Sequence, residues 1–205
     1  MDCLKISVRI ILSGCLLFAA ALVQATTILQ VGTSELVNES ELVFEGRVQD
    51  RWSANNGQVI VTYVRFEVVE VVKGEYGRET LTLQFMGGVV DGEGLVVAAS
   101  NIPELGEHGV YFVESTTVEM VNPLYGWSQG QFIVEEQAAD ERVYTVARQP
   151  VTGFVDQASP PGTVIATTHA LGVGTAGSVS AQALTLQQFK DQVRGLIVAQ
   201  SEEGE

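Results

Sequence analysis

The residue types best suited to nucleophilic or metal chemistry are scarce in this chain, whose 205 residues include two histidines and two cysteines. His108 lies beside glycines just before an apolar segment, a setting typical of a turn or a strand edge. His169 lies in a Thr-Thr-His-Ala segment that we expect to be a solvated loop. The two histidines are far apart and the chain has no His-Glu-x-x-His motif, so we expect neither a nucleophilic triad nor a catalytic zinc.

Several acidic clusters have residue types that could bind metals or transfer protons. Residues 91–94 (DGEG) lack the alternating Asp/Asn run and the distal Glu of a calcium loop, which favours a plain acidic turn. The pairs 135–136 and 140–141 fall at a strand end and a hairpin, where solvated charges are expected. The sequence therefore predicts no metal, no cofactor and no enzymatic activity. A hydrolase with an unrecognised site remains an alternative, and its mark would be His108 and a carboxylate in one pocket.

Three aromatic residues are the best candidates for ligand contact. Trp52 ends a predicted strand beside an Asn-Gly turn, and Tyr125 and Trp127 lie in a loop between proline and glycine. Aromatic side chains at the rim of a small barrel are a common binding platform. The alternative is that these rings close the ends of the barrel as part of its core.

The charge balance restricts the class of partner. Lys and Arg total 11 against 25 Asp and Glu, a formal net charge of −14. Nucleic acids and anionic membranes need clustered cations, so we expect neither to be bound. A protein or a small ligand is the expected partner, and the protein is expected to be a monomer or a weak oligomer.

The first 25 residues have the form of a secretory signal. The apolar run 10–23 fits the ~7–15 residue core of such a signal and is shorter than the ~18 residues that a membrane span needs. Small residues before the predicted cleavage point place it after Ala25. A lipid anchor at Cys15 is the disfavoured alternative, because the apolar run continues beyond that cysteine. We expect a periplasmic or extracellular protein that loses both cysteines with its leader, and hence has no disulfide.

In the remaining chain, apolar and polar residues alternate in the way typical of β-strands. A short helix is expected at residues 33–40, capped by Thr33 or Ser34. A slip of phase at Val68-Val69 predicts a β-bulge. Strands are expected at residues 42–51, 58–73, 80–86, 109–115, 117–121, 131–135 and 142–147, with a turn at 54–57 and a glycine-rich excursion at 87–94.

The composition changes at Pro150. Residues 150–182 are rich in Gly, Ser, Thr, Ala and Pro, which predicts a flexible excursion with little core, and at most a short strand at 163–167. An amphipathic helix is expected at residues 183–200, capped by Thr185, with Lys190 off its apolar stripe. Residues 201–205 form an acidic tail.

Residues 33–115 resemble the netrin-like version of the OB-fold, known from tissue inhibitors of metalloproteinases. The resembling segments are residues 40–48 (SELVFEGRV), the strand at 63–72 running into Lys73-Gly74, and residues 106–113 (GEHGVYFV). The resemblance implies an all-β protein, in which residues 26–149 form a small closed or partly open OB/netrin-like barrel flanked by the two helices. Residues 126–132 (GWSQGQF) also resemble a segment of uncharacterised exported bacterial proteins.

The resemblance also implies a function to be weighed. Inhibitors of this family chelate the protease zinc through the amine and carbonyl of an N-terminal cysteine, whereas this chain would begin at Thr26 after cleavage. A free amine can still ligate a metal when it is deprotonated. The expected function is an exported, non-enzymatic binding module that uses barrel-rim loops, and the alternative is an inhibitor of a zinc metalloprotease.

Overall fold

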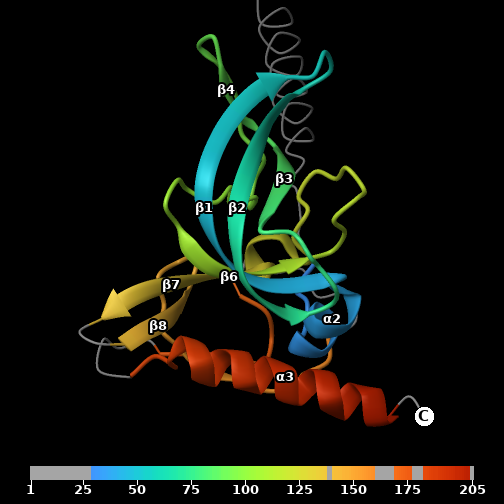
Figure 1. The fold of residues 1–205 in the computed structure, drawn as a ribbon, viewed down its shortest axis with the longest axis vertical. Coiled ribbons are helices and arrows are strands. Elements are labelled where there is room, and N and C mark those ends of the chain that lie inside the picture. The colour runs from blue at the N-terminus through green and yellow to red at the C-terminus, as the bar shows by residue number, and fades with distance from the viewer. Residues whose placement is uncertain (1–28, 138–139, 160–168, 177–181, 204–205) are drawn as a thin grey trace, which may run out of the picture.

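The computed structural model describes residues 29–137, 140–159, 169–176 and 182–203, and most of its regular structure is β-strand. Six strands form one antiparallel sheet in the order β3-β2-β1-β6-β7-β8 (Figure 1). These strands are β1 (Leu42–Asn55), β2 (Ile60–Lys73), β3 (Thr80–Met86), β6 (His108–Val113), β7 (Gln131–Gln137) and β8 (Asp140–Thr145). Two small sheets pair β4 (Gly88–Val90) with β5 (Glu93–Leu95), and β9 (Val151–Phe154) with β10 (Val173–Thr175). The helices are α2 (Thr33–Glu39), α3 (Leu186–Glu203) and the 3₁₀ helix η2 (Trp127–Gly130).

Strands β1 and β2 form a long ribbon that extends beyond the rest of the sheet (Figure 1). Within β1, only residues 42–47 pair with β6. Within β2, residues 61–67 pair with β3. The turn at the tip agrees with the Asn-Gly prediction, because Asn56 N–H donates to the Val59 carbonyl and Gly57 has a φ of 89°. Val69 has no partner in the register between the two strands, which confirms the predicted bulge.

The two faces of the sheet carry separate cores. One core lies between the sheet, the two helices and the β9–β10 pair, and contains Val43, Phe112 and Phe189. The other lies on the opposite face among β1, β2, β3 and β6, and contains Phe44, Phe66 and aligned apolar residues of β3. Because side chains alternate between the two faces, the first residues of β1 contribute to both cores.

The Lys73-Gly74 step holds α2 against the sheet. Lys73 Nζ donates to the carbonyl oxygens of Val37 at 2.6 Å, Asn38 at 2.9 Å and Ser40 at 2.7 Å, all at the end of α2. The last carbonyls of a helix lack partners within it, and a cation there is favourable. Gly74 has a φ of 85°, and a Cβ at this position would lie 2.4 Å from the Glu41 carbonyl oxygen. Both residues are therefore needed in this turn.

The N-cap predicted from the sequence is correct for α3 and wrong for α2. Thr185 Oγ1 accepts from the N–H of Gln188 at 3.1 Å, and Gln188 Oε1 accepts from the N–H of Thr185 at 2.9 Å, which confirms the predicted cap of α3. The cap prediction for α2 was wrong, because Gly32 occupies that position without a side-chain cap. Thr33 Oγ1 instead donates to the Val155 carbonyl, which ties α2 to the segment after β9.

Four further expectations about the fold need correction. The described strands form an open sheet with β3 and β8 at its edges, not a closed barrel. The excursion at 87–94 contains most of the β4–β5 hairpin, and residues 117–121 are not a strand. Helix α3 continues to Glu203, through part of the predicted acidic tail.

The segment expected to be a flexible excursion contributes to the core. Within its described part, β9 and β10 pair with each other, and Val151, Phe154, Ala170 and Val173 are buried. The strand predicted at 163–167 lies outside the described residues. No helix in the described part of the chain is both long and apolar enough to cross a membrane.

Candidate functional site

The predicted aromatic residues do not form one cluster. Trp52 lies on the β1–β2 ribbon, is 41% exposed and stacks on Tyr63 with ring centroids 5.4 Å apart. Tyr125 is half-buried against the core beneath α3, and this burial raises the pKa of its phenol. Trp127 is half-buried at the start of η2. Thr26, Ala25 and Cys15 lie outside the described residues.

Trp52 belongs to two rows of side chains on one face of the sheet. Trp52, Tyr63 and Gln84 are directly opposed across β1, β2 and β3. The neighbouring row contains Asp50, Arg65 and Thr82, and Arg65 Nη2 lies 2.8 Å from Asp50 Oδ2. Residues directly opposed or two apart along neighbouring strands share a face of the sheet. A stacked aromatic pair therefore lies beside an ion pair, an amide and a hydroxyl.

A hollow adjoins this face beside β3. It has a volume of about 200 Å³, and its lining includes Tyr63, Gln84 and Val118. The loop that bears Val118 is held by Glu41, because Thr116 N–H donates to Glu41 Oε2 at 3.2 Å and Thr116 Oγ1 donates to Oε1. The hydroxyl bond from Thr116 lowers the pKa of the Glu41 carboxyl below its ordinary value. The loop therefore presents a fixed wall, with Val118 59% exposed.

The chemistry of this face suits ligand contact. Aromatic rings supply flat apolar area, and the polar side chains around them can orient a bound group. Sequence reasoning identified Trp52 but missed Tyr63 and Gln84. The signal for Tyr63 was present, because counting back symmetrically from the turn at the ribbon tip places Trp52 opposite Tyr63. Gln84 required the register between β2 and β3, which no local pattern specifies.

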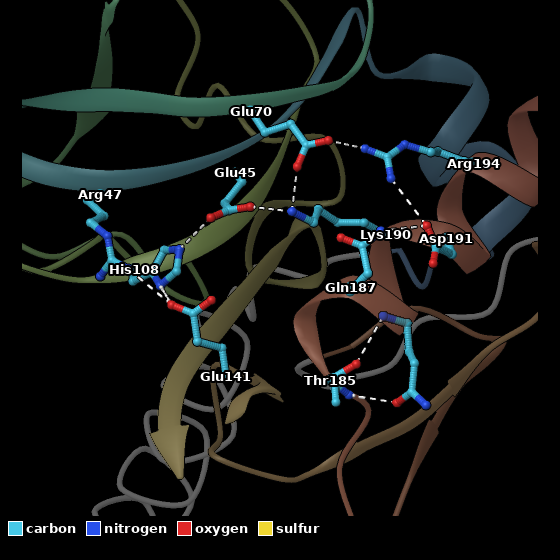
Figure 2. A network of polar contacts seen from close by, with 11 residues as sticks. Glu45, Arg47, Glu70, His108, Glu141, Thr185, Gln187, Lys190, Asp191 and Arg194 are labelled. Carbon is cyan, nitrogen blue, oxygen red and sulfur yellow. Dashed lines mark hydrogen bonds and ion pairs between the residues drawn. The ribbon is translucent and has the colours of Figure 1, made fainter. Parts of the chain in front are cut away.

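A second cluster of functional groups joins α3 to the sheet (Figure 2). Lys190 of α3 is buried, and its Nζ lies 2.6 Å from Glu45 Oε2 on β1 and also contacts Glu70 on β2. Arg194, one turn further along α3, contacts the other oxygen of Glu70. On the far side, Glu45 Oε1 lies 3.0 Å from His108 Nε2.

The environment of this cluster favours the charged forms of Glu45 and Lys190. Burial opposes ionisation of Glu45, but hydrogen bonds from His108 and Lys190 outweigh it and lower the pKa of the carboxyl. Burial likewise opposes the charge on Lys190, but its bonds to Glu45 and Glu70 outweigh this effect and raise its pKa. Glu45 and Lys190 are therefore a buried ion pair in their charged forms.

His108 and a carboxylate do converge, which is the mark named above for an unrecognised hydrolase. His108 lines a hollow of about 400 Å³, and Glu45 lines another of about 400 Å³. However, His108 is only 6% exposed, its Nε2 faces Glu45, and its Nδ1 lies 3.5 Å from Glu141 Oε1. Arg47 Nη2 in turn contacts Glu141 at 3.1 Å. Each ring nitrogen of His108 thus faces a carboxylate, as expected of a network of polar contacts that holds α3 on the sheet.

Residues 126–130 (GWSQG) formally match the Gly-x-Ser-x-Gly pattern of a nucleophile elbow, a match that the sequence reasoning missed. In such an elbow the serine occupies a strained turn from a strand into a helix and exposes its hydroxyl. Here Ser128 lies within η2, directly before strand β7, and is 7% exposed. The positive φ belongs to Gly126 and Trp127. The segment therefore does not have the geometry of an elbow.

The same segment holds the start of the described chain. Gln129 is buried, its Oε1 accepts from Val31 N–H at 3.1 Å, and its Nε2 donates to the Leu29 carbonyl at 3.0 Å. Leu171 N–H donates to the Val31 carbonyl at 2.9 Å from the other side. A Cβ on Gly126 would lie 2.8 Å from a Val31 methyl carbon. Residues 29–31 are thus fixed beside the loop that bears Tyr125 and Trp127.

No group of three or more His, Cys, Asp or Glu residues within the described part of the chain is arranged to hold a metal ion. Comparisons with models of known protein families, with curated proteins and with solved structures find no match.

Proposed function

We propose that this protein is an exported, non-enzymatic binding module of OB/netrin-like architecture that holds its partner on the face around Trp52. The observation that carries this proposal is the stacking of exposed Trp52 on half-buried Tyr63, flanked by Gln84 and by the Asp50–Arg65 ion pair. OB-folds bind their ligands on the face of the corresponding strands and on the loops beside it. The loop that bears Val118 lies beside this face, in the position expected of a rim loop that contacts a partner.

The energetics favour contact through the aromatic pair. Trp52 is 41% exposed, so a bound partner could bury the rest of its apolar surface and gain free energy from doing so. The net charge of −14 favours a neutral or basic partner over a nucleic acid. A protein or small ligand with a flat apolar surface and groups that hydrogen bond with Gln84 or Thr82 fits this site.

The test compares Trp52→Ala with Val96→Ala, because Val96 is 90% exposed and lies outside this face. Affinity capture from the native host with the wild-type protein identifies the partner. Its dissociation constant should rise about ten-fold or more for Trp52→Ala and stay unchanged for Val96→Ala. Both variants should keep the thermal midpoint of the wild type. Undiminished binding by Trp52→Ala would refute the site, and turnover in a hydrolase assay would refute the non-enzymatic assignment.

The fixed N-terminal segment favours a second candidate, an inhibitor of a zinc metalloprotease. Gln129 and Leu171 hold residues 29–31 by hydrogen bonds, in a chain expected to lack a disulfide. With cleavage after Ala25, the amine of Thr26 would precede this anchored segment by a few residues and could reach a protease zinc. The mature protein should then reduce cleavage by zinc proteases, and acetylation of the Thr26 amine or Gln129→Ala should restore it. Equal cleavage with and without the mature protein would end this candidate.

A further inference from the structure

The outer edge of β3 has no partner strand within the described part of the chain. β3 stands first in the sheet order, and its only neighbour in that sheet is β2. Hydrogen bonds at its C-terminal end show which backbone groups face outward. Met86 N–H donates away from β2 to the Val121 carbonyl, whereas Gly87 N–H donates to Ile60 of β2. Backbone groups of alternate residues point the same way, so the N–H and C=O of Thr82 and Gln84 point outward.

These outward groups have no hydrogen-bond partner among the described residues. The opposite edge of the sheet differs, because Val143 N–H of β8 donates to the Leu184 carbonyl. Natural edge strands are usually protected by charges, proline or a bulge. Residues 80–86 (TLTLQFM) contain no charge and no proline, and their pairing with β2 has no shift of register. Among the described residues, the β8 edge is therefore partly covered by the chain at Leu184, whereas the β3 edge is open at Thr82 and Gln84.

Space for an added strand lies beside this edge. Two hollows with volumes of about 200 Å³ and 580 Å³ share Thr82, Thr116 and Thr117 in their linings, so both lie between β3 and the loop that follows β6. Figure 1 shows this loop beside β3. The contact of Thr116 with Glu41 fixes the far wall.

We propose that this groove receives an extended peptide segment of another protein, which pairs with β3 as an added strand. This partner class rests on the proposed binding function and specifies it further. Main-chain bonds to Thr82 and Gln84 would supply affinity, and side chains of the added strand would alternate between the faces. The linings of the two hollows contain exposed Glu75 and Glu119 against one exposed cation, Arg78, so a segment with basic flanks is favoured. Two copies with a net charge of −14 each repel, which disfavours pairing between copies.

Amide hydrogen exchange measures this pairing directly. The probe is a lysine-flanked peptide of alternating Thr and Val, added to the full chain. Exchange at the Thr82 and Gln84 amides should slow about ten-fold or more, while the Leu83 amide, which already bonds to β2, should change little. The same peptide N-methylated at alternate residues, so that the bonding N–H groups are blocked, should have no effect. Equal protection by both peptides, or none at Thr82 and Gln84, would overturn the proposal.

A variant of the protein provides the matched test. Gln84→Pro removes an outward N–H without removing a bond to β2, and should abolish peptide protection at Thr82, whereas Gln84→Ala should preserve it. If Gln84→Pro unfolds, the N-methylated peptide still decides the question. Trp52→Ala should leave strand addition intact, so failure of the aromatic face and failure of the edge are distinguishable. Protected Thr82 and Gln84 amides in a dimer without peptide would show that a second copy occupies the edge, which would overturn the assignment to another protein.

Discussion

Buried charged residues are tolerated here because each has partners of opposite sign. Lys190 was predicted to lie off the apolar stripe of α3, but the structure buries it against the sheet, where it is only 6% exposed. Its ammonium group lies between Glu45 and Glu70, and Glu45 lies between Lys190 and His108. Burying an unpaired charge is costly, whereas a fully paired set approaches balance. The cluster therefore specifies how α3 docks more than it adds to stability.

Removing one partner of this set should be costly. Lys190→Met leaves Glu45 buried beside His108 alone, and should lower the free energy of unfolding by about 3–5 kcal/mol. The double variant Lys190→Met/Glu45→Gln removes both charges and should recover much of that loss. Urea unfolding monitored by circular dichroism measures both values. A single variant as stable as the wild type would show that the contact with Lys190 is not the partner that Glu45 requires.

Two glycines with similar backbone angles should differ in their tolerance of alanine. Gly74 and Gly57 have φ values of 85° and 89°, but only at Gly74 would a Cβ collide with the Glu41 carbonyl, since Gly57 has no atom within 4 Å. Gly57→Ala should cost only the left-handed conformation, about 1–2 kcal/mol, and Gly74→Ala should cost more. Thermal unfolding of the two variants measures the difference. Equal costs would contradict the close approach at Gly74.

At the scale of elements, α3 depends on its first turn as well as on its apolar face. Thr185 and Gln188 exchange two hydrogen bonds before the helix packs through Leu186, Phe189 and Val193. Such a capping box satisfies backbone N–H groups that a helix leaves unpaired at its start. The cap was predictable because it involves residues only three apart.

Removing the cap should weaken the whole fold modestly. Thr185→Ala deletes the hydroxyl that accepts from Gln188 N–H, and should lower the free energy of unfolding by about 1 kcal/mol. Thr185→Ser retains a hydroxyl and should be close to the wild type. The midpoint of urea unfolding distinguishes the two. An alanine variant with an unchanged midpoint would mean that water replaces the bond without cost.

At the scale of the whole molecule, several carboxyls are stabilised in their charged form by folding. Hydrogen bonds to Glu45 outweigh the effect of burial, as do those to Glu35 from Ser159, and a bond from Thr116 acts on Glu41. Each of the three pKa values is lower in the folded state than the ordinary 4.5. Groups of this kind stabilise the fold above the unfolded pKa and lose that contribution as the pH falls through the folded pKa.

Acid should therefore destabilise the protein. The free energy of unfolding should be nearly constant from neutral pH to about pH 5 and should decrease below about pH 4.5, as these carboxyls bind protons. Glu45→Gln removes one titrating group and should show a shallower decrease than the wild type. Unfolding curves in urea across this pH range measure both slopes. A steeper decrease in the variant would contradict the assigned role of Glu45.

The local features of the fold could be predicted from the sequence, because they depend on neighbouring residues. Alternation identified β1, β2 and β3, a slip of phase located the bulge at Val69, and the cap of α3 followed from Thr185. The Asn-Gly turn placed Trp52 near the tip of a ribbon. These patterns report which residues share a face, but not what covers that face.

Only the tertiary structure decided the rest, because it depends on pairings between distant parts of the chain. Glu45 and Lys190 are 145 residues apart, and nothing local brings their charges together. The same applies to Gln84 beside Tyr63, and to the wall that Thr116 forms opposite β3. Whether the sheet closes depends on which edges find partners, and here β8 finds Leu184 while β3 remains open. The sequence determined the strands, and long-range packing determined which of their faces and edges remain available to bind.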